Sequence, residues 1–99
     1  MQKGGAVYIL TNKNHTALYT GVTRSLRERM FEHHTGKHKN AFTKKYNVTK
    51  LVYYKAYQHI EEAIAMEKKV KGMSRTKKEA LVNGLNPEWK DLYEDVKEW

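Results

Sequence analysis

The chain has 99 residues, 39% of them hydrophobic, which is the size and composition of one globular domain. It contains no cysteine, so disulfide bonds and thiolate chemistry are excluded and a bound metal needs oxygen or imidazole ligands. The formal net charge is +8, which favours a polyanion such as nucleic acid as partner over a basic surface that is merely solvated. With no apolar run of the roughly 18 residues that span a membrane and no signal peptide, we expect a cytoplasmic protein without membrane association.

The N-terminal part predicts a β-hairpin. Residues 6–11 and 18–22 are rich in Val, Ile, Tyr and Leu, and a short polar stretch separates them. A two-residue turn between Asn12 and His15 would fix the register of the two strands. This register pairs Leu10 with Ala17, Tyr8 with Tyr19, and Ala6 with Gly21. Directly opposed residues share a face, so the two tyrosines would stand side by side.

Helical periodicity begins after the hairpin. Ser25 and Glu28 form a capping-box signature at the start of a helix over residues 25–34. The basic stretch 35–46 is interpreted as a loop. The remaining predicted elements are a strand over 51–57, a helix over 60–71 ended by Gly72, a helix from the N-cap Ser74 to about residue 84, and a helix over 88–97 with Asn86 as N-cap.

The order β-β-α-β-α-α-α indicates an α+β fold with a small three-stranded antiparallel sheet flanked by helices. We expect one domain spanning residues 1–99.

Two polar residues interrupt apolar helix faces. Glu67 falls in the middle of the apolar stripe of the predicted helix 60–71, where a bare carboxylate is costly to bury. Its charge is therefore balanced either by a bound metal or by a neighbouring lysine, and the helical wheel alone does not choose. On the helical wheel of the first predicted helix, His33 falls between the apolar residues Leu26 and Met30. It is there either a catalytic group or a structural histidine.

Three stretches of the chain match motifs that occur together in one family. Val7-Tyr8-Ile9 and Tyr19-Thr20-Gly21 resemble the paired tripeptides of the GIY-YIG nucleases. Aligned on the tyrosines, this chain has Ala6-Val7-Tyr8 where the family has Gly-Ile-Tyr, and Thr20 where the second tripeptide has Ile. Leu26, Arg29 and His33 resemble the Leu-x-x-Arg-x-x-x-His helix of that family, and residues 62–68 resemble the helix that supplies its single metal-binding glutamate.

The C-terminal half strengthens this resemblance. Residues 71–75 and 86–92 are similar to the Lys-Gly-x-Ser-Arg and Asn-Pro-x-Trp-x-Asp-Leu segments of the uncharacterised standalone bacterial members of the family. Repair, homing and restriction members fuse the domain to targeting modules. The resemblance therefore implies that an unidentified protein partner could supply targeting here.

The resemblance implies a divalent-metal-dependent endonuclease that hydrolyses phosphodiester bonds in structured or damaged nucleic acid, with DNA favoured over RNA. It assigns Mg²⁺ or Mn²⁺ to Glu67, the scissile phosphate to Arg29, activation or positioning of water to Tyr8 or Tyr19, and a supporting role to His33. The alternative is a nucleic-acid-binding module of the same fold that is catalytically silent.

Two further residues keep two interpretations each. Gly21 lets the backbone approach the site closely or only marks a kink at the end of a strand. Asn86 lies near the metal site, as in some relatives, or serves only as an N-cap.

Basic residues on both sides of the third strand are expected to contact phosphates. These residues are Lys37, Lys39, Lys44, Lys45, Lys68, Lys69, Lys71, Arg75, Lys77 and Lys78. Interleaved with them, His38, Phe42 and Tyr46 either stack on exposed bases or pin the loop to the core.

Overall fold

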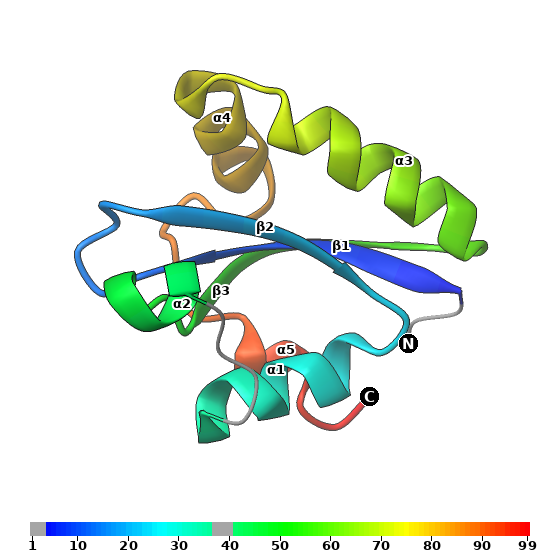
Figure 1. Cartoon of the computed structure of the whole chain (residues 1–99), viewed down its shortest axis with the longest axis horizontal. Helices are drawn as coiled ribbons and strands as arrows, with labels where there is room; N and C mark the ends of the chain where they lie inside the picture. Colours follow the sequence, from blue (N-terminus) through cyan, green and yellow to red (C-terminus); the bar gives the residue numbers. More distant parts are fainter. Residues whose placement is uncertain (1–3, 37–40) are drawn as a thin grey trace.

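The computed structural model describes residues 4–36 and 41–99. At its centre is a three-stranded antiparallel sheet with strand order β2-β1-β3 (Figure 1). The strands are β1 (Gly5–Thr11), β2 (Leu18–Thr23) and β3 (Lys50–Tyr57). The α+β fold with this small sheet agrees with the sequence prediction.

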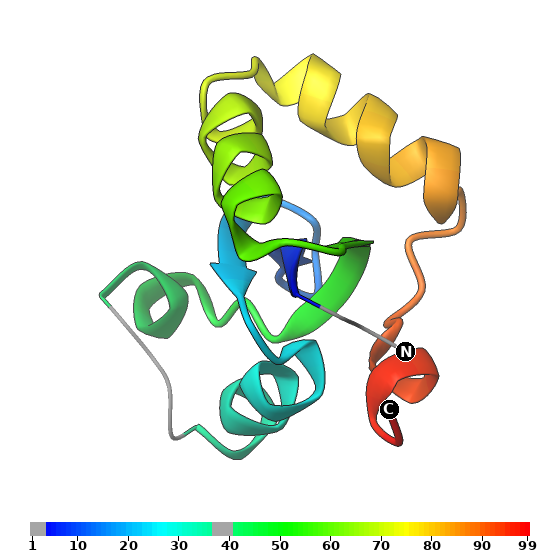
Figure 2. The ribbon, with the colours of Figure 1, turned by 90° about the vertical axis from the view of Figure 1, so that its right-hand side faces the viewer.

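Helices cover both faces of the sheet. The cartoon shows α3 (Ile60–Lys71) and α4 (Arg75–Leu85) on one side, and α1 (Leu26–Thr35) and α5 (Tyr93–Val96) on the other (Figures 1 and 2). The short α2 (Ala41–Tyr46) precedes β3. No helix among the described residues is long and apolar enough to span a membrane.

The central strand β1 is buried along its whole length because it has a neighbour on each edge and helices on each face. Its residues alternate between two apolar clusters, as the two-residue period of a strand requires. Tyr8 and Leu10 pack with Met30 on the α1 side, whereas Ile9 packs with Val70 of α3 on the other side. Tyr8 therefore enters the core next to the helix that carries Arg29 and His33.

The hairpin turn forms where the sequence predicts it, but the loop is longer. The amide of His15 donates to the carbonyl of Asn12 across 3.1 Å. The Asn12 side-chain oxygen then accepts the amides of Thr16 at 2.8 Å and Ala17 at 3.2 Å, which replaces two strand hydrogen bonds with side-chain ones. Strand pairing consequently starts beyond the loop, at Thr11 and Leu18.

The predicted register was therefore wrong by two residues. Tyr8 lies opposite Gly21, and Leu10 lies opposite Tyr19. A shift by an even number of residues leaves every side chain on its face. Tyr8 and Tyr19 still share a face, as diagonal neighbours rather than directly opposed ones.

The first three predicted helices are confirmed to within a residue or two. Ser25 is the N-cap of α1 and accepts the amide of Glu28 at 3.4 Å. Helix α3 covers the predicted range before Gly72, and Ser74 is the N-cap of α4.

The last predicted helix is wrong over most of its length, and Asn86 does not cap it. The side-chain nitrogen Nδ2 of Asn86 donates to the backbone carbonyls of Val52 at 3.2 Å and Lys90 at 2.8 Å. The side-chain oxygen Oδ1 of Asn86 accepts the backbone amide of Lys90 at 3.0 Å. Trp89 adopts a φ of 55°, in the left-handed region, which a right-handed helix cannot include. Only Tyr93–Val96 form a helix, α5.

The basic loop prediction is corrected in part. Residues Ala41–Tyr46 form helix α2 instead of a loop. Lys37, His38 and Lys39 lie outside the described residues.

Candidate active site

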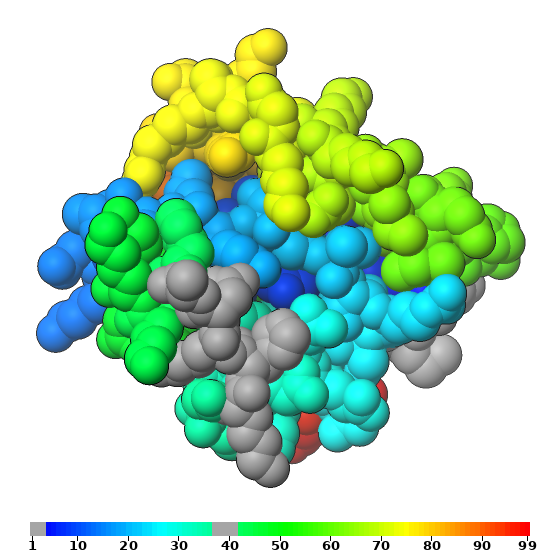
Figure 3. Space-filling model, in the orientation of Figure 1, coloured from blue at the N-terminus to red at the C-terminus, as the bar shows by residue number. Residues whose placement is uncertain are grey.

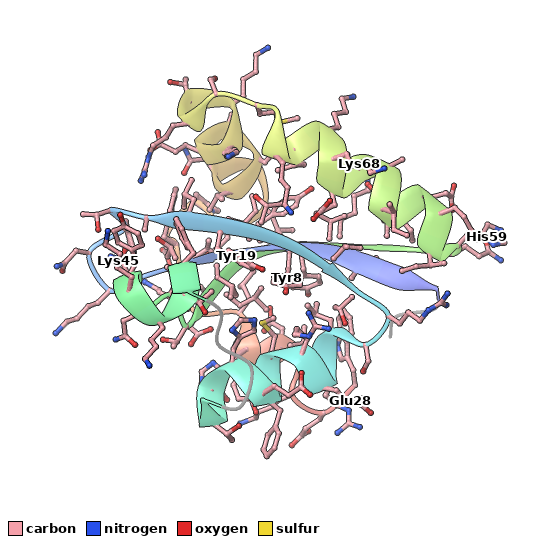
Figure 4. The ribbon with its side chains drawn as sticks, in the orientation of Figure 1. Tyr8, Tyr19, Glu28, Lys45, His59 and Lys68 are labelled. Atoms are coloured by element: carbon pink, nitrogen blue, oxygen red, sulfur yellow. The ribbon has the colours of Figure 1, made fainter. Side chains whose placement is uncertain are left out.

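Three aromatic rings from three different elements meet at the centre of the molecule. The ring centroids of Tyr8 on β1 and Tyr19 on β2 lie 6.5 Å apart. His33 on α1 lies 6.2 Å from Tyr8 and 6.4 Å from Tyr19. Figure 4 shows both tyrosines between α3 and α1. Residues 11 to 25 positions apart in the sequence are thus brought together as the resemblance implies.

Gly21 makes the placement of Tyr8 possible. It lies opposite Tyr8, and a Cβ atom built on it would overlap the end of the Tyr8 ring, including the hydroxyl. The missing side chain lets this ring extend across β2, the edge strand of the sheet. The structure therefore accounts for a glycine at position 21 by the close approach of the Tyr8 side chain to the backbone of β2.

Arg29 and Glu67 bring opposite charges to the Tyr8 hydroxyl. Burial raises the pKa of Tyr8 to about 12, and the charge and hydrogen bond of Arg29 lower it by less than burial raises it. The Glu67 carboxylate, and Tyr19 when it is ionised, contribute smaller increases to the same pKa. Arg29 also pairs with Glu32 at 3.4 Å on the surface of α1. Tyr8 is therefore a neutral phenol near neutral pH, next to a guanidinium.

Glu67 forms an ion pair on α3. Lys71, one turn later, places its Nζ atom 2.7 Å from a carboxylate oxygen of Glu67. The Glu67 side chain is 13% exposed, and its hydrogen bond with Lys71 raises the pKa of the lysine. The sequence left open whether a metal or a neighbouring lysine balances the charge of Glu67. The structure shows a lysine in this role, and it is Lys71 rather than Lys68 or Lys69.

The residues fit a metal held in the way the resemblance implies. Within the described ranges, no group of three or more His, Cys, Asp or Glu side chains is arranged to hold a metal ion. Mg²⁺ is commonly held by one or two carboxylates with water and substrate phosphate completing its shell. Glu67 offers one recessed carboxylate of this kind, and in this structure that carboxylate is paired with the Lys71 ammonium.

The space-filling view looks onto the region between α1 and α3 that contains the two tyrosines. Helix α3 overhangs it on one side and α1 bounds it on the other, and atoms of β1 are visible in dark blue between them (Figure 3). A pocket of about 300 Å³ adjoins it on the α1 side, lined by Thr23, Arg24, Ser25, Glu28, Arg29 and Glu32. Arg29 thus borders both the pocket and the tyrosine cluster.

Comparison with known proteins identifies the family. Residues 4–80 match the sequence model of the GIY-YIG catalytic domain. The chain belongs to the GIY-YIG family. It is 37% identical over 82 residues to a UPF0213 protein of Syntrophus aciditrophicus (strain SB), in an alignment covering 83% of this chain and 92% of that protein.

A solved structure supports the same assignment. The solution NMR structure of a UPF0213 protein from Bacillus halodurans superimposes with a TM-score of 0.54 at 32% identity, covering 88% of this chain and 90% of that one. GIY-YIG is a nuclease-type family.

The lysines expected to contact phosphates differ in their exposure and contacts. Lys44 and Lys45 on α2, Lys68 and Lys69 on α3 and Lys77 on α4 are exposed, and Lys78 is half-buried. Lys71 is engaged by Glu67.

Arg75 is engaged within the protein. Its guanidinium donates to the carbonyls of His15 and Thr16, the latter at 3.0 Å, and to the carboxylate of Glu79 at 2.8 Å. It thereby fastens the β1–β2 loop to α4. Sequence reasoning did not detect this role, because the two carbonyls are about 60 residues away along the chain.

Proposed function

We propose that this GIY-YIG protein is a divalent-metal-dependent endonuclease that hydrolyses phosphodiester bonds in structured or damaged nucleic acid. The observation that carries the proposal is the convergence of two phenols, an imidazole, a guanidinium and a carboxylate on one region: Tyr8, Tyr19, His33, Arg29 and Glu67. A module that only binds nucleic acid has no need of a carboxylate among cations.

Arg29 is proposed to hold the scissile phosphate. Its planar guanidinium matches two phosphate oxygens and stays charged throughout the working pH range. Its ion-pair partner Glu32 lies at 3.4 Å and is partly exposed. A phosphate that accepts two hydrogen bonds from the guanidinium can therefore compete with Glu32 for Arg29.

Tyr8 and Tyr19 are proposed to orient and activate the attacking water. The water attacks phosphorus in line with the departing oxygen and gives its proton to the ionised phenol of Tyr8 or Tyr19. The phosphorus–oxygen bond on the far side breaks, and its electron pair stays on the departing oxygen. Because the pKa of Tyr8 is about 12, this phenol accepts the proton only where added positive charge lowers its pKa, and otherwise orients the water through a hydrogen bond. His33, in ring contact with both tyrosines, keeps them in place.

Glu67 is proposed to hold the metal, with Lys71 released towards the substrate phosphates. Mg²⁺ or Mn²⁺ bound there would stabilise negative charge on the phosphoryl and departing oxygens and lower the pKa of a nearby phenol or water.

The test is cleavage of labelled single-stranded, flapped, duplex and RNA substrates at low salt with Mg²⁺ or Mn²⁺. Glu67→Gln, which keeps the shape but removes the charge, is compared with Glu61→Gln, an exposed glutamate of the same helix. We expect cleavage by the parent and by Glu61→Gln, and a loss of at least about 100-fold in Glu67→Gln with binding retained.

Binding without cleavage in either metal would reject the nuclease and leave the catalytically silent binding module. Cleavage that survives Glu67→Gln would reject the role of Glu67 in metal binding.

A further inference from the structure

A row of aromatic rings continues from the candidate active site onto the surface. The ring centroid of Phe42 on α2 lies 5.9 Å from that of Tyr19, with 34° between the ring planes. The Tyr46 ring follows one helical turn later, 4.8 Å from Phe42 and inclined by 45°. Helix α2 therefore extends the tyrosine cluster outward beside β2, the edge strand.

The two outer rings of this row are open to solvent. Phe42 is 38% and Tyr46 is 40% exposed, whereas Thr43, next to Phe42 in the helix, is buried. Packing of α2 on the core through Thr43 and the Phe42–Tyr19 contact thus leaves part of both outer rings uncovered. Because the two rings contact each other, they form one exposed aromatic patch, and contiguous apolar patches are typical of binding surfaces.

The charge around the rings matches a nucleic-acid strand. The Nζ atom of Lys45 lies 5.3 Å from the Tyr46 ring centroid, and Lys44 beside it is exposed. Aromatic rings interleaved with lysines are the composition of surfaces that bind single strands, where rings stack on bases and lysines contact phosphates.

We propose that Phe42 and Tyr46 form a stacking platform for an unpaired base next to the phosphate held at the candidate active site. The position of that phosphate rests on the proposed function, while the platform itself rests on the exposed rings. In an intact duplex both faces of each base are covered by neighbouring bases, so the platform selects single-stranded, frayed or flapped segments.

The experiment measures binding, with no cleavage required. A labelled oligonucleotide is titrated as a single strand and as its duplex, with EDTA present so that no metal-dependent cleavage occurs. A fluorescent purine analogue in the strand reports stacking through quenching. The parent should bind the single strand at least tenfold more tightly and quench the analogue.

Variants assign the preference to the two rings. Phe42→Ala and Tyr46→Ala should each weaken single-strand binding about fivefold or more, with duplex binding changed less than about twofold. Tyr46→Ala tests the platform without removing a ring that contacts Tyr19. Phe42→Leu keeps apolar bulk but lacks the aromatic face, so it should fold like the parent and bind like Phe42→Ala. Phe31→Ala, at a 52% exposed aromatic residue of α1, is the matched control and should bind like the parent.

The outcomes separate this proposal from the nuclease. Equal affinity of the parent for strand and duplex, parent-like binding by Phe42→Leu, or an equal loss in Phe31→Ala would overturn the platform even if the protein cleaves DNA. Ring-dependent strand binding by a protein that cleaves nothing would retain the platform and reject the nuclease.

Discussion

At the scale of single residues, the position of the Tyr8 ring depends on the absence of a Cβ atom at Gly21. We predict that Gly21→Ala lowers stability by about 1–3 kcal/mol, the usual cost of overpacking, because the added Cβ overlaps the Tyr8 ring. Cleavage should fall with it, since the phenol is displaced. Chemical denaturation and initial rates of the folded variant measure the two effects.

Gly84→Ala is the control for this substitution. Apart from its chain neighbours and the nearby backbone of α4, no atom lies within 4 Å of a Cβ built at Gly84, which is an exposed position. Alanine there should therefore raise stability by up to about 1 kcal/mol. If Gly21→Ala were as stable and active as the parent, Tyr8 would not occupy the position described.

The buried phenol of Tyr8 also predicts a dependence of stability on alkaline pH. Its pKa is raised from 10.0 to about 12 in the folded protein, so above about pH 10 the unfolded chain loses this proton while the folded chain keeps it. The stabilisation is present below pH 10 and is lost as the pH rises through 12, about 2–3 kcal/mol in all. Denaturant titrations across this range should show a shallower decline in Tyr8→Phe.

Tyr46→Phe serves as the comparison, because it removes a phenol hydroxyl from an exposed residue rather than from a buried one. An identical alkaline slope in Tyr8→Phe and the parent would contradict the burial of this hydroxyl.

At the scale of secondary-structure elements, the sequence predicted the strands and the first three helices because their periodicity and caps are local signals. Ser25 and Ser74 mark helix starts through hydrogen bonds within three residues. Such signals are readable without knowledge of the rest of the fold.

The errors arose where one side chain can bond to more than one part of the chain. Asn12 binds two loop amides and shifts the strand register. Asn86 precedes a proline, as helix N-caps often do, but binds a carbonyl of β3, 34 residues earlier. The family resemblance placed Tyr8, Tyr19 and His33 in one site, and their rings do lie close together. The ion pair of Glu67 with Lys71 and the exposed rings of α2 required the assembled fold.

The segment after α4 supplies a prediction at this scale. Asn86→Ala should destabilise the protein by about 1–3 kcal/mol, because it removes three hydrogen bonds, one of them to the carbonyl of buried Val52. Metal affinity and the rate per folded molecule should stay at parent values if Asn86 is purely structural. Thermal unfolding and Mn²⁺ titration measure these separately.

Asn83→Ala provides the comparison, because the side-chain oxygen of exposed Asn83 accepts a hydrogen bond from Trp89 Nε1, and loss of this bond should cost less than about 1 kcal/mol. A drop in Mn²⁺ affinity for Asn86→Ala at unchanged folding would instead place Asn86 in the metal site.

At the scale of the whole molecule, the question is whether the net charge of +8 acts as a diffuse attraction or through phosphate contacts at fixed positions. Lys68 of α3 and Lys77 of α4 are on the helices of the face that carries Glu67. Lys97 follows α5, on the opposite face, and pairs with Glu94 at 2.7 Å. Removing any one of the three lowers the net charge equally.

We therefore predict different salt dependences for these variants. Each lysine that contacts a phosphate should reduce the slope of log affinity against log salt by roughly 0.7–0.9, so Lys68→Ala and Lys77→Ala should flatten the slope and Lys97→Ala should not. Titrations of labelled single strands at several salt concentrations in EDTA measure the slopes. Equal flattening by all three substitutions would mean that overall charge attracts nucleic acid without a defined track, and the strand would then be positioned by the site and the aromatic rings of α2 alone.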